Sequence, residues 1–295
     1  MVSEISLLIP VYNQNVLALV EALRQETTAF LIPCEIRVYD DGSNSETLQQ
    51  NRSLQGVSGV IYQELPQNVG RSQIRYNLAQ EARFEHLLFL DNDVLPVHPD
   101  FLHRYLTQAQ GDVTVGGVAY QASAPKGAEL RWKYGKAREE APAHLRQKNP
   151  YQRVFTSNLL VSRKVFLACF PKNELSGYGH EDTLFAWRLE QNQIPVQHLD
   201  NPVWHLGLES ADIFLLKTQQ ALHNLMHLHR EFNLGNQTKL LSAYASLKKW
   251  KATKLLRENS QWLFPLLKRN LVSRKPSLRF FDLYRLLLLD RYLRK

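Results

Sequence analysis

The sequence predicts an α/β fold in which a mostly parallel sheet carries helices on both faces, followed by a helical extension. Strand-like runs alternate with helical patterns over the first 120 residues, and this alternation is typical of parallel sheets. Polar clusters follow four of these strand-like runs. From Ala211 onward the pattern becomes helical and basic. We therefore expect an α/β domain over residues 1–210 and a basic helical extension over residues 211–295.

Five runs rich in β-branched and aromatic residues predict the first strands. They cover residues 5–9, 35–39, 60–64, 86–90 and 113–120. Apolar residues at helical spacing predict a first helix after Asn15, which is suited to cap it. A second helix is expected around Ile74 and Leu78, and a third after Pro99.

Residues 121–150 interrupt the alternation. The segment is polar, holds three prolines, and mixes basic side chains with Trp132 and Tyr134. It predicts a long loop or loose helix, and segments of this kind are usually functional or disordered. Beyond it we expect a strand over residues 154–161, a helix over 182–191, a strand-like run over 201–204 and a last helical pattern over 278–294.

Composition narrows the class of protein. With 44% hydrophobic residues and a mean hydropathy of −0.34, the chain is globular, and no apolar stretch is long enough to cross a bilayer. Strand-like sequence begins almost at the first residue, which leaves no room for a signal peptide. Two cysteines exclude a disulfide framework and a cysteine-based zinc site. We therefore expect a cytoplasmic protein.

The positive charge is concentrated at the end of the chain. From Ala211 onward, 17 Lys and Arg stand against 5 Asp and Glu, a net charge of +12. The preceding residues carry 19 against 23, a net charge of −4. Such asymmetry indicates an acidic partner for the basic part: anionic lipid, nucleic acid or an anionic saccharide. An ordinary solvated helical surface explains it equally well.

The strand-like run 86–90 ends in two carboxylates, Asp91 and Asp93, separated by Asn92. In open α/β sheets, ligands bind at the carboxyl ends of the strands. Two acids held together repel each other unless a cation or proton lies between them. Mg²⁺ typically uses one or two carboxylates together with phosphate oxygens of a substrate. Taken alone, however, the tripeptide is more typical of a solvated turn.

Three more polar segments follow strands in the same way, at residues 10–13, 40–43 and 68–71. Singly, each is typical of ordinary turn chemistry. Four in succession, all at strand carboxyl ends, predict that they line one crevice together with Asp91 and Asp93.

As an ordered set, these segments resemble the nucleotide-sugar glycosyltransferases of the GT-A fold, and in particular glycosyltransferase family 2. The matching elements are residues 9–13, 40–43, 68–77, 91–93, 157–163, 177–182 and 204–205. They cover about residues 3–208 in the family's order, and the C-terminal third matches nothing. The resemblance implies inverting transfer from a nucleoside-diphosphate sugar, UDP-linked rather than GDP-linked, to an acceptor hydroxyl. It also implies Mn²⁺ or Mg²⁺ as cofactor.

The resemblance implies a donor site and a metal site. The donor residues would be Pro10, Tyr12, Asn13, Asp40, Asp41, Asn68, Arg71, Asp91 and Asn92. Asp41 would accept from the N–H of a uracil-type ring with support from Asp40, because carboxylates suit donors of this kind. Arg71 would reach the base or the diphosphate. The metal would be held by Asp93 and His205, with Asp91 beside it and facing the donor sugar or ribose.

On the acceptor side, the resemblance makes Asp182 the general base and lets Glu181 bind the acceptor or donor sugar. A simpler interpretation is that the negative charges of both acids only stabilise the N-terminus of a helix, and this is compatible with these roles. Asn158, Gly179 and His180 would also face the acceptor. His180 replaces the Gly or Ala that relatives often carry, which puts the choice of acceptor in doubt.

Two other functions compete. A sugar nucleotidyltransferase shares the architecture but usually carries a Gly-rich loop where this chain has residues 12–15, Tyr-Asn-Gln-Asn. A catalytically inactive subunit that binds a nucleotide sugar or saccharide is opposed by the intact acids and His205. The favoured hypothesis is that the chain is a hexosyl- or N-acetylhexosaminyltransferase acting in surface polysaccharide, lipopolysaccharide or glycolipid synthesis. Its acceptor would be a saccharide or lipid-linked saccharide. Residues 211–295 would attach it to the inner face of a membrane, and nucleic acid is not an expected partner.

Overall fold

The computed structural model describes residues 2–29, 32–172, 174–175, 177–232, 234, 238–249, 257–258 and 260–293. The chain divides into two compact units. The first comprises residues 1–120, 139–176 and 181–207, and the second comprises residues 121–138, 177–180 and 208–295. The second unit therefore draws on segments from the middle of the sequence as well as on the basic C-terminal part.

Within the described residues of the first unit, seven strands form the main sheet in the order β3-β2-β1-β4-β8-β6-β9. These strands are β1 (Ile5–Val11), β2 (Cys34–Asp40), β3 (Val60–Glu64), β4 (His86–Leu90), β6 (Val113–Val115), β8 (Asn158–Ser162) and β9 (Gln197–His198). β8 runs antiparallel to β4 and β6, whereas the other neighbours are parallel. The predicted mostly parallel α/β architecture is confirmed.

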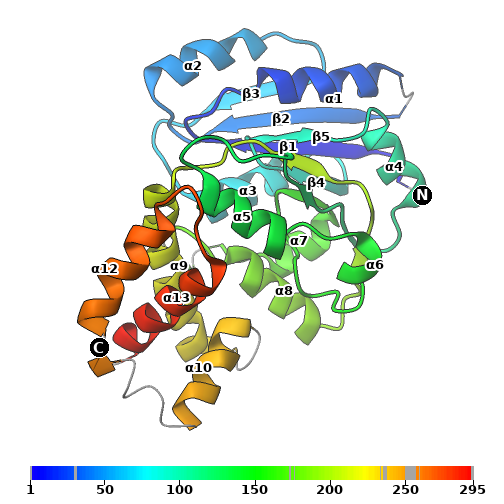
Figure 1. Cartoon of the computed structure of the whole chain (residues 1–295). Coiled ribbons are helices and arrows are strands. Elements are labelled where there is room, and N and C mark those ends of the chain that lie inside the picture. The colour runs from blue at the N-terminus through cyan, green and yellow to red at the C-terminus, as the bar shows by residue number, and fades with distance from the viewer. Residues whose placement is uncertain are drawn as a thin grey trace. The chain divides into compact units, whose positions relative to one another are not determined.

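Helices cover both faces of this sheet (Figure 1). They are α1 (Leu17–Ala29), α2 (Ser45–Asn51), α3 (Arg71–Glu81), α4 (Phe101–Gln108), α6 (Ala143–Arg146), α7 (Arg163–Cys169) and α8 (Glu181–Gln191), with a 3-10 turn at Arg52–Leu54. α1 lies on one face, and α3, α7 and α8 lie on the other (Figure 1). Every residue of β1 is buried, as expected for an apolar strand between two helical layers. On the second face, the rings of Phe89 and Phe166 stack with centroids 4.3 Å apart.

A small second sheet in the same unit joins distant segments. It contains β5 (Val94–Pro96), β10 (Val203–His205) and β7 (Val118–Ala119) in the order β5-β10-β7. β10 is antiparallel to β5, with His205 opposite Val94, and parallel to β7. This register places the start of β5 beside the end of β10.

Two predicted strands need correction. The expected strand over 113–120 is two strands in different sheets, because the chain bends at Gly116 and Gly117, and Gly117 has a φ of +91°. A Cβ at Gly117 would lie 2.8 Å from the Arg146 guanidinium, so the close approach favours glycine. The expected strand over 154–161 begins at Asn158. The segment 121–150, expected as a long loop or loose helix, contains two helices, α5 (Glu129–Arg138) and α6.

The second unit is helical. Besides α5 it contains α9 (Ala211–Phe232), α10 (Lys239–Lys249), α12 (Ser260–Leu271) and α13 (Leu278–Tyr292). The rings of Tyr134, Phe214 and Phe281 meet at its centre with centroids 5.3–5.5 Å apart. The Lys133 ammonium donates to the Pro276 carbonyl at 2.8 Å, which fastens α5 to the segment before α13. The last predicted helical residue, Arg294, lies outside the described residues.

Across the part of the chain that the structure describes, no helix combines the length and apolar character needed to cross a membrane. The boundary at residue 210 stays a prediction.

Candidate active site

The loops after β1 and β2 are fastened to each other. The Asn13 backbone N–H donates to Ser43 Oγ at 2.7 Å, and the Asn44 N–H donates to Asn13 Oδ1 at 2.8 Å. Asn13 has a φ of +51°, a conformation that asparagine tolerates better than most residues. These bonds leave Tyr12 with 51% of its surface exposed at the edge of the sheet. Pro10 is buried inside β1, so it shapes the end of the strand and does not itself line the edge.

Asp40, the last residue of β2, and Asp41, which follows it, form hydrogen bonds within the protein. Asp41 accepts from the backbone N–H of Val69 at 2.7 Å and of Gly70 at 3.1 Å. Asp40 is fully buried and accepts from the Ser43 N–H at 2.7 Å. Burial raises the pKa of both carboxyls. Asp41 therefore holds the exposed Asn68 loop against the end of β2, and its contact with a nucleobase stays a prediction.

Asp91 belongs to a charged cluster at the start of α3. Its carboxylate forms an ion pair with Arg75, whose side chain is 3% exposed. Arg71 Nη2 lies 3.8 Å from Asp91 Oδ2, and Arg71 Nε lies 3.0 Å from Glu181 Oε1. Two guanidinium groups thus lie beside the Asp91 carboxylate, and its expected place among the metal ligands stays a prediction. Asn92, which follows it, donates its side-chain amide to the Tyr12 carbonyl at 3.4 Å.

Asp182 stands in the first turn of α8, where Thr156 holds it. Its Oδ1 accepts from Thr156 Oγ1 at 2.9 Å and from the Thr156 N–H at 3.3 Å. Burial raises the pKa of Asp182 to about 7, the charges of Glu181 and Asp91 act in the same direction, and Arg75 opposes them. A carboxylate with a pKa near neutrality is suited to accept a proton at physiological pH.

Asp93 and His205 are brought together by the small sheet. Because β10 pairs with β5, His205 Nε2 lies 3.2 Å from Asp93 Oδ2. The other ring nitrogen, Nδ1, lies 3.1 Å from the Tyr120 hydroxyl, which in turn bonds Glu139. A hydrogen bond of this kind on the outer nitrogen is what orients a metal-binding imidazole.

Gly207 closes over the Asp93 carboxylate. A Cβ at this position would lie 2.6 Å from Asp93 Cβ and 2.8 Å from Asp93 Cγ. Such distances are shorter than real carbon contacts, so only glycine leaves the carboxylate where it is.

The residues present fit a divalent cation. Two ligands that share one ion at about 2.1 Å each, at a right angle, lie about 3 Å apart, close to the 3.2 Å between Asp93 Oδ2 and His205 Nε2. No group of three or more His, Cys, Asp or Glu side chains suited to a metal exists among the described residues. An ion at this pair would complete its coordination with water and substrate phosphate oxygens.

Among the expected acceptor residues, Asn158 lies in the first unit. It is 1% exposed, and its amide donates to the carbonyls of Gly117 and Asn201 at 2.8 Å while Tyr105 donates to its Oδ1. Its polar atoms are used inside the protein, and its acceptor role stays a prediction.

Gly179 and His180 belong to the second unit. The Asn224 amide donates to the Gly179 carbonyl at 3.0 Å, and a Cβ at Gly179 would meet Ala221 at 2.7 Å. Both residues have positive φ angles, +98° and +73°. Their acceptor role stays a prediction.

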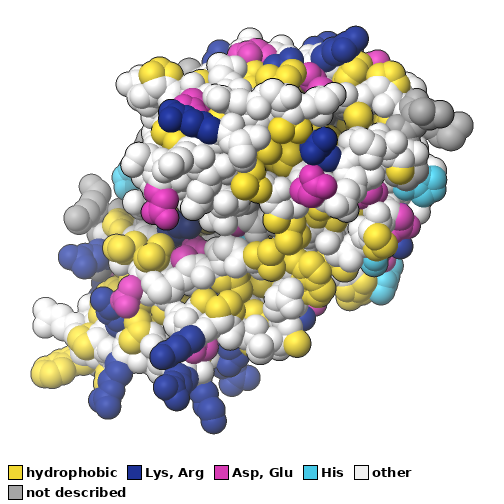
Figure 2. All heavy atoms as spheres, turned by 90° about the horizontal axis from the view of Figure 1, so that it is seen from above, with side chains coloured by type: hydrophobic (Ala, Val, Ile, Leu, Met, Phe, Trp, Pro, Cys, Tyr) yellow, Lys and Arg dark blue, Asp and Glu magenta, His cyan; other side chains and the backbone are white. Residues whose placement is uncertain are grey.

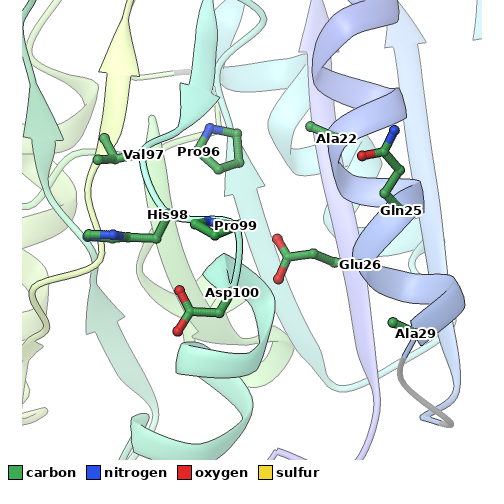
Figure 3. A pocket seen from close by; sticks show the side chains of 9 residues that line it. All are labelled: Ala22, Gln25, Glu26, Ala29, Pro96, Val97, His98, Pro99 and Asp100. Atoms are coloured by element: carbon green, nitrogen blue, oxygen red, sulfur yellow. The ribbon is translucent and has the colours of Figure 1, made fainter.

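A separate hollow of about 510 Å³ lies between α1 and the segment from β5 to α4, and none of the predicted site residues lines it (Figure 3). Glu26 is its buried acid. Its carboxylate accepts from the Leu102 N–H at 2.8 Å and so caps α4. Burial raises the pKa of Glu26 to about 7. This capping accounts for the acid without a ligand.

Sequence reasoning missed three supporting residues. Arg75 stood within a matched segment, and its signal was an arginine on the apolar side of a predicted helix. Thr156 and Tyr120 carried no signal, because their roles depend on side chains far away in the sequence.

Acids at the carboxyl ends of a mostly parallel sheet agree with the class that the motif order predicts, the glycosyltransferases of the GT-A fold. The sequence model of Glycosyl transferase family 2 matches residues 6–167. The chain belongs to this family.

Solved structures share the fold. The mannosyltransferase PcManGT from Pyrobaculum calidifontis aligns with a TM-score of 0.56 and 13% identity over 99% of this chain and 88% of that one. S. aureus TarS 1-349 aligns with a TM-score of 0.52 and 16% identity over 99% of this chain and 91% of that one. Glucosyl-3-phosphoglycerate synthase from Mycobacterium tuberculosis aligns with a TM-score of 0.51 and 18% identity over 75% of this chain and 78% of that one. A search of curated protein sequences gives no significant match.

Proposed function

We propose that this chain is an inverting, divalent-metal-dependent glycosyltransferase. It moves a hexosyl or N-acetylhexosaminyl group from a nucleoside-diphosphate sugar, UDP-linked rather than GDP-linked, to an acceptor hydroxyl. The acceptor is a saccharide or lipid-linked saccharide of the kind built into surface polysaccharide, lipopolysaccharide or glycolipid.

One observation carries the proposal: acids near the same sheet edge stand in different chemical settings. Asp93 is partly exposed beside His205, with 3.2 Å between Oδ2 and Nε2. Asp182 is partly buried in the first turn of α8, and the loss of hydration there raises its pKa to about 7. The first setting suits a cation and the second suits a proton acceptor, which are the two groups that direct transfer to a hydroxyl requires.

The chain's own residues account for the remaining steps. Asp182 accepts the proton of the attacking hydroxyl, while Thr156 holds its Oδ1 in place. Arg71 is 40% exposed along its side chain and has room to contact the diphosphate as well as Glu181. Exposed Tyr12 offers a ring face to the base. A single displacement from the face opposite the leaving group inverts the anomeric centre. The cation, when bound at Asp93 and His205, neutralises the charge that develops on the diphosphate.

The ligands named for the similar structures support a nucleoside-diphosphate sugar as donor and Mn²⁺ as metal, and they include both GDP and UDP. PcManGT is described with GDP-Man and Mn²⁺, TarS with UDP, and the M. tuberculosis synthase with UDP and Mn²⁺. We favour UDP for this chain because Asp41 follows β2 in the position that the family resemblance assigns to a uracil-type ring.

Thermal-shift measurements with a panel of UDP- and GDP-sugars, each with and without Mn²⁺, test the proposal. We expect a rise in melting temperature with a UDP-sugar that depends on Mn²⁺. A ligand at 100 times its Kd adds about 2.7 kcal/mol to the free energy of unfolding. Asp93→Ala should remove the Mn²⁺-dependent part of this rise. Asp112→Ala, an exposed acid in the same unit, is the matched control and should keep it.

An Asp93→Ala variant that retained the full Mn²⁺-dependent shift would contradict the metal assignment. A wild-type protein indifferent to every nucleotide sugar would contradict the donor assignment.

A further inference from the structure

Helix α12 of the second unit is apolar on both of its faces. On the inner face, Leu267 and Leu271 are buried, and the ring of Phe264 contacts Tyr284 with centroids 5.7 Å apart. A helix that only covers a core is polar on its other side. The opposite face of α12 is not.

The outer face of α12 carries large exposed apolar side chains. Trp262 is 78% exposed and Leu266 is 63% exposed. Pro265 and Arg269 are exposed on the same side, because positions three and four residues apart share one face of a helix. Val272 continues this face at 44% exposure, and its N–H still bonds the Lys268 carbonyl at 3.1 Å.

Exposed apolar residues of α9 lie next to this face. Lys268 Nζ is 3.8 Å from Asp212 Oδ1, which brings the first turn of α9 beside α12. Ile213 in that turn is 49% exposed, and Leu216 in the next turn is 60% exposed. An exposed apolar surface drawn from two helices usually marks an interaction site. We call it the α9–α12 surface, made of Ile213, Leu216, Trp262, Pro265, Leu266, Arg269 and Val272.

The charge around this surface is mainly positive. Residues 260–281 contain five basic side chains and no acidic one. The basic residues are Lys268, Arg269, Arg274, Lys275 and Arg279. Figure 2 shows Lys and Arg side chains gathered along the lower edge of the view, beside exposed hydrophobic side chains. The Lys268–Asp212 pair is largely exposed on both sides, at 62% and 68%, so solvent screens it and it does little to offset the positive field.

We propose that the α9–α12 surface docks on an anionic lipid bilayer. Trp262 would lie at the level of the headgroups, where tryptophan is enriched, and Leu266 and Val272 would reach the upper acyl chains. The basic residues would contact the anionic headgroups. A membrane needs both signals, since apolar insertion or charge alone gives weak attachment.

Other occupants fit less well. A second copy of the chain would bring two positive surfaces together, which repel each other. A nucleic acid would satisfy the basic residues and leave Ile213, Leu216 and Leu266 without an apolar partner. A bilayer with anionic headgroups satisfies both kinds of side chain.

Flotation of the full chain with vesicles tests the proposal. We expect binding to vesicles of phosphatidylcholine and phosphatidylglycerol in equal parts, little binding to phosphatidylcholine alone, and weakening by salt. Trp262→Ala with Leu266→Ala should lower the vesicle partition coefficient about tenfold or more. Arg269→Gln with Lys275→Gln should also lower it and reduce its dependence on salt.

Matched controls come from the first unit. Leu145→Ala with Ile61→Ala removes two exposed aliphatic side chains, and Lys148→Gln with Lys164→Gln removes two exposed charges. Both pairs should bind vesicles as the wild type does. Flotation requires no sugar transfer, so its result is independent of the proposed activity.

Two outcomes would overturn the proposal. The first is indifference of the wild type to anionic vesicles. The second is a dimer in lipid-free solution that Trp262→Ala with Leu266→Ala converts to a monomer, which would assign the surface to a second copy.

Discussion

Asp93 and Asp182 are both acids of the first unit, but their surroundings differ. Asp93 is partly exposed beside an imidazole and under a glycine, and its pairing depends on a three-stranded sheet. Asp182 lies in the first turn of α8, is also partly buried, and takes two hydrogen bonds from Thr156. In the proposed function, Asp93 holds a cation and Asp182 accepts a proton. The neighbours of each carboxylate, rather than the residue type, would separate the two roles.

The largest expected effect comes from removing the charge of Asp182. Asp182→Asn keeps the size and the bonds from Thr156 but cannot accept a proton from the acceptor. We expect kcat to fall by about 10²–10⁴-fold, with donor affinity nearly unchanged. Steady-state kinetics and donor titration measure the two quantities.

Asp112→Asn serves as the control for this change and should leave kcat unaltered. Near-normal turnover by Asp182→Asn would show that Asp182 is not the general base. The proposed difference in role between Asp182 and Asp93 would then be wrong.

A smaller change disturbs Asp93 without touching its carboxylate. In Gly207→Ala the new Cβ must displace Asp93, because only 2.8 Å separates that position from Asp93 Cγ. A shift of about 1 Å at a reacting centre costs about 10²-fold, so we expect a loss of kcat/KM near that size and a weaker response to Mn²⁺. Gly111→Ala has open space at its Cβ but a φ of +71°, so it shows what backbone strain without a collision does to activity. Unchanged Mn²⁺ dependence in Gly207→Ala would show that Asp93 does not hold the ion.

The smallest effect should appear in the pH profile. Because burial raises the pKa of Asp182 to about 7, the base is protonated below that pH, and kcat should rise with pH and level off above 7. Thr156→Val removes the hydroxyl that stabilises the anion, a bond worth about 1.5–3 kcal/mol. We expect kcat to fall about tenfold and the rising limb to move to higher pH.

Thr156→Ser keeps the hydroxyl and should restore the wild-type profile. A fall in kcat with an unmoved pH limb would mean that Thr156 supports only the fold. The raised pKa has the opposite effect on stability: the contribution of Asp182 is complete below its ordinary value of 3.8 and is lost as pH rises through about 7.

Much of the fold could be predicted from the local pattern of apolar and polar residues in the sequence. The predicted strands 60–64 and 86–90 coincide with β3 and β4, because apolar runs between polar turns need only their neighbours to be recognised. The error at 113–120 arose because an extended run looks continuous, while the break depends on Arg146 packing against Gly117 from elsewhere in the fold.

Less of the candidate site than of the fold could be predicted from the sequence. Motif order suggested Asp93, His205 and Asp182, but the sequence could not show that guanidinium groups lie beside Asp91 or that Thr156 holds Asp182. Asn158 was placed on the acceptor side through the family resemblance alone, and the sequence could not show that its amide bonds inside the protein. Tyr105 and Asn201, which bury it, lie 53 and 43 residues away.

The pairing of β5 with β10 also has a consequence for how the protein is made. Asp93 and His205 are separated by 112 residues, and strands of three residues join them. When the nascent chain has emerged from the ribosome only as far as Asp182, it contains Asp91, Asp93 and Asp182, but His205 has not yet emerged. Closing the loop between Asp93 and His205 costs conformational entropy, and the pairing of two short strands offsets little of it. A cation bound by both residues would stabilise the closed loop, so in the proposed function we expect metal supply during folding to affect how quickly the chain becomes resistant to proteases.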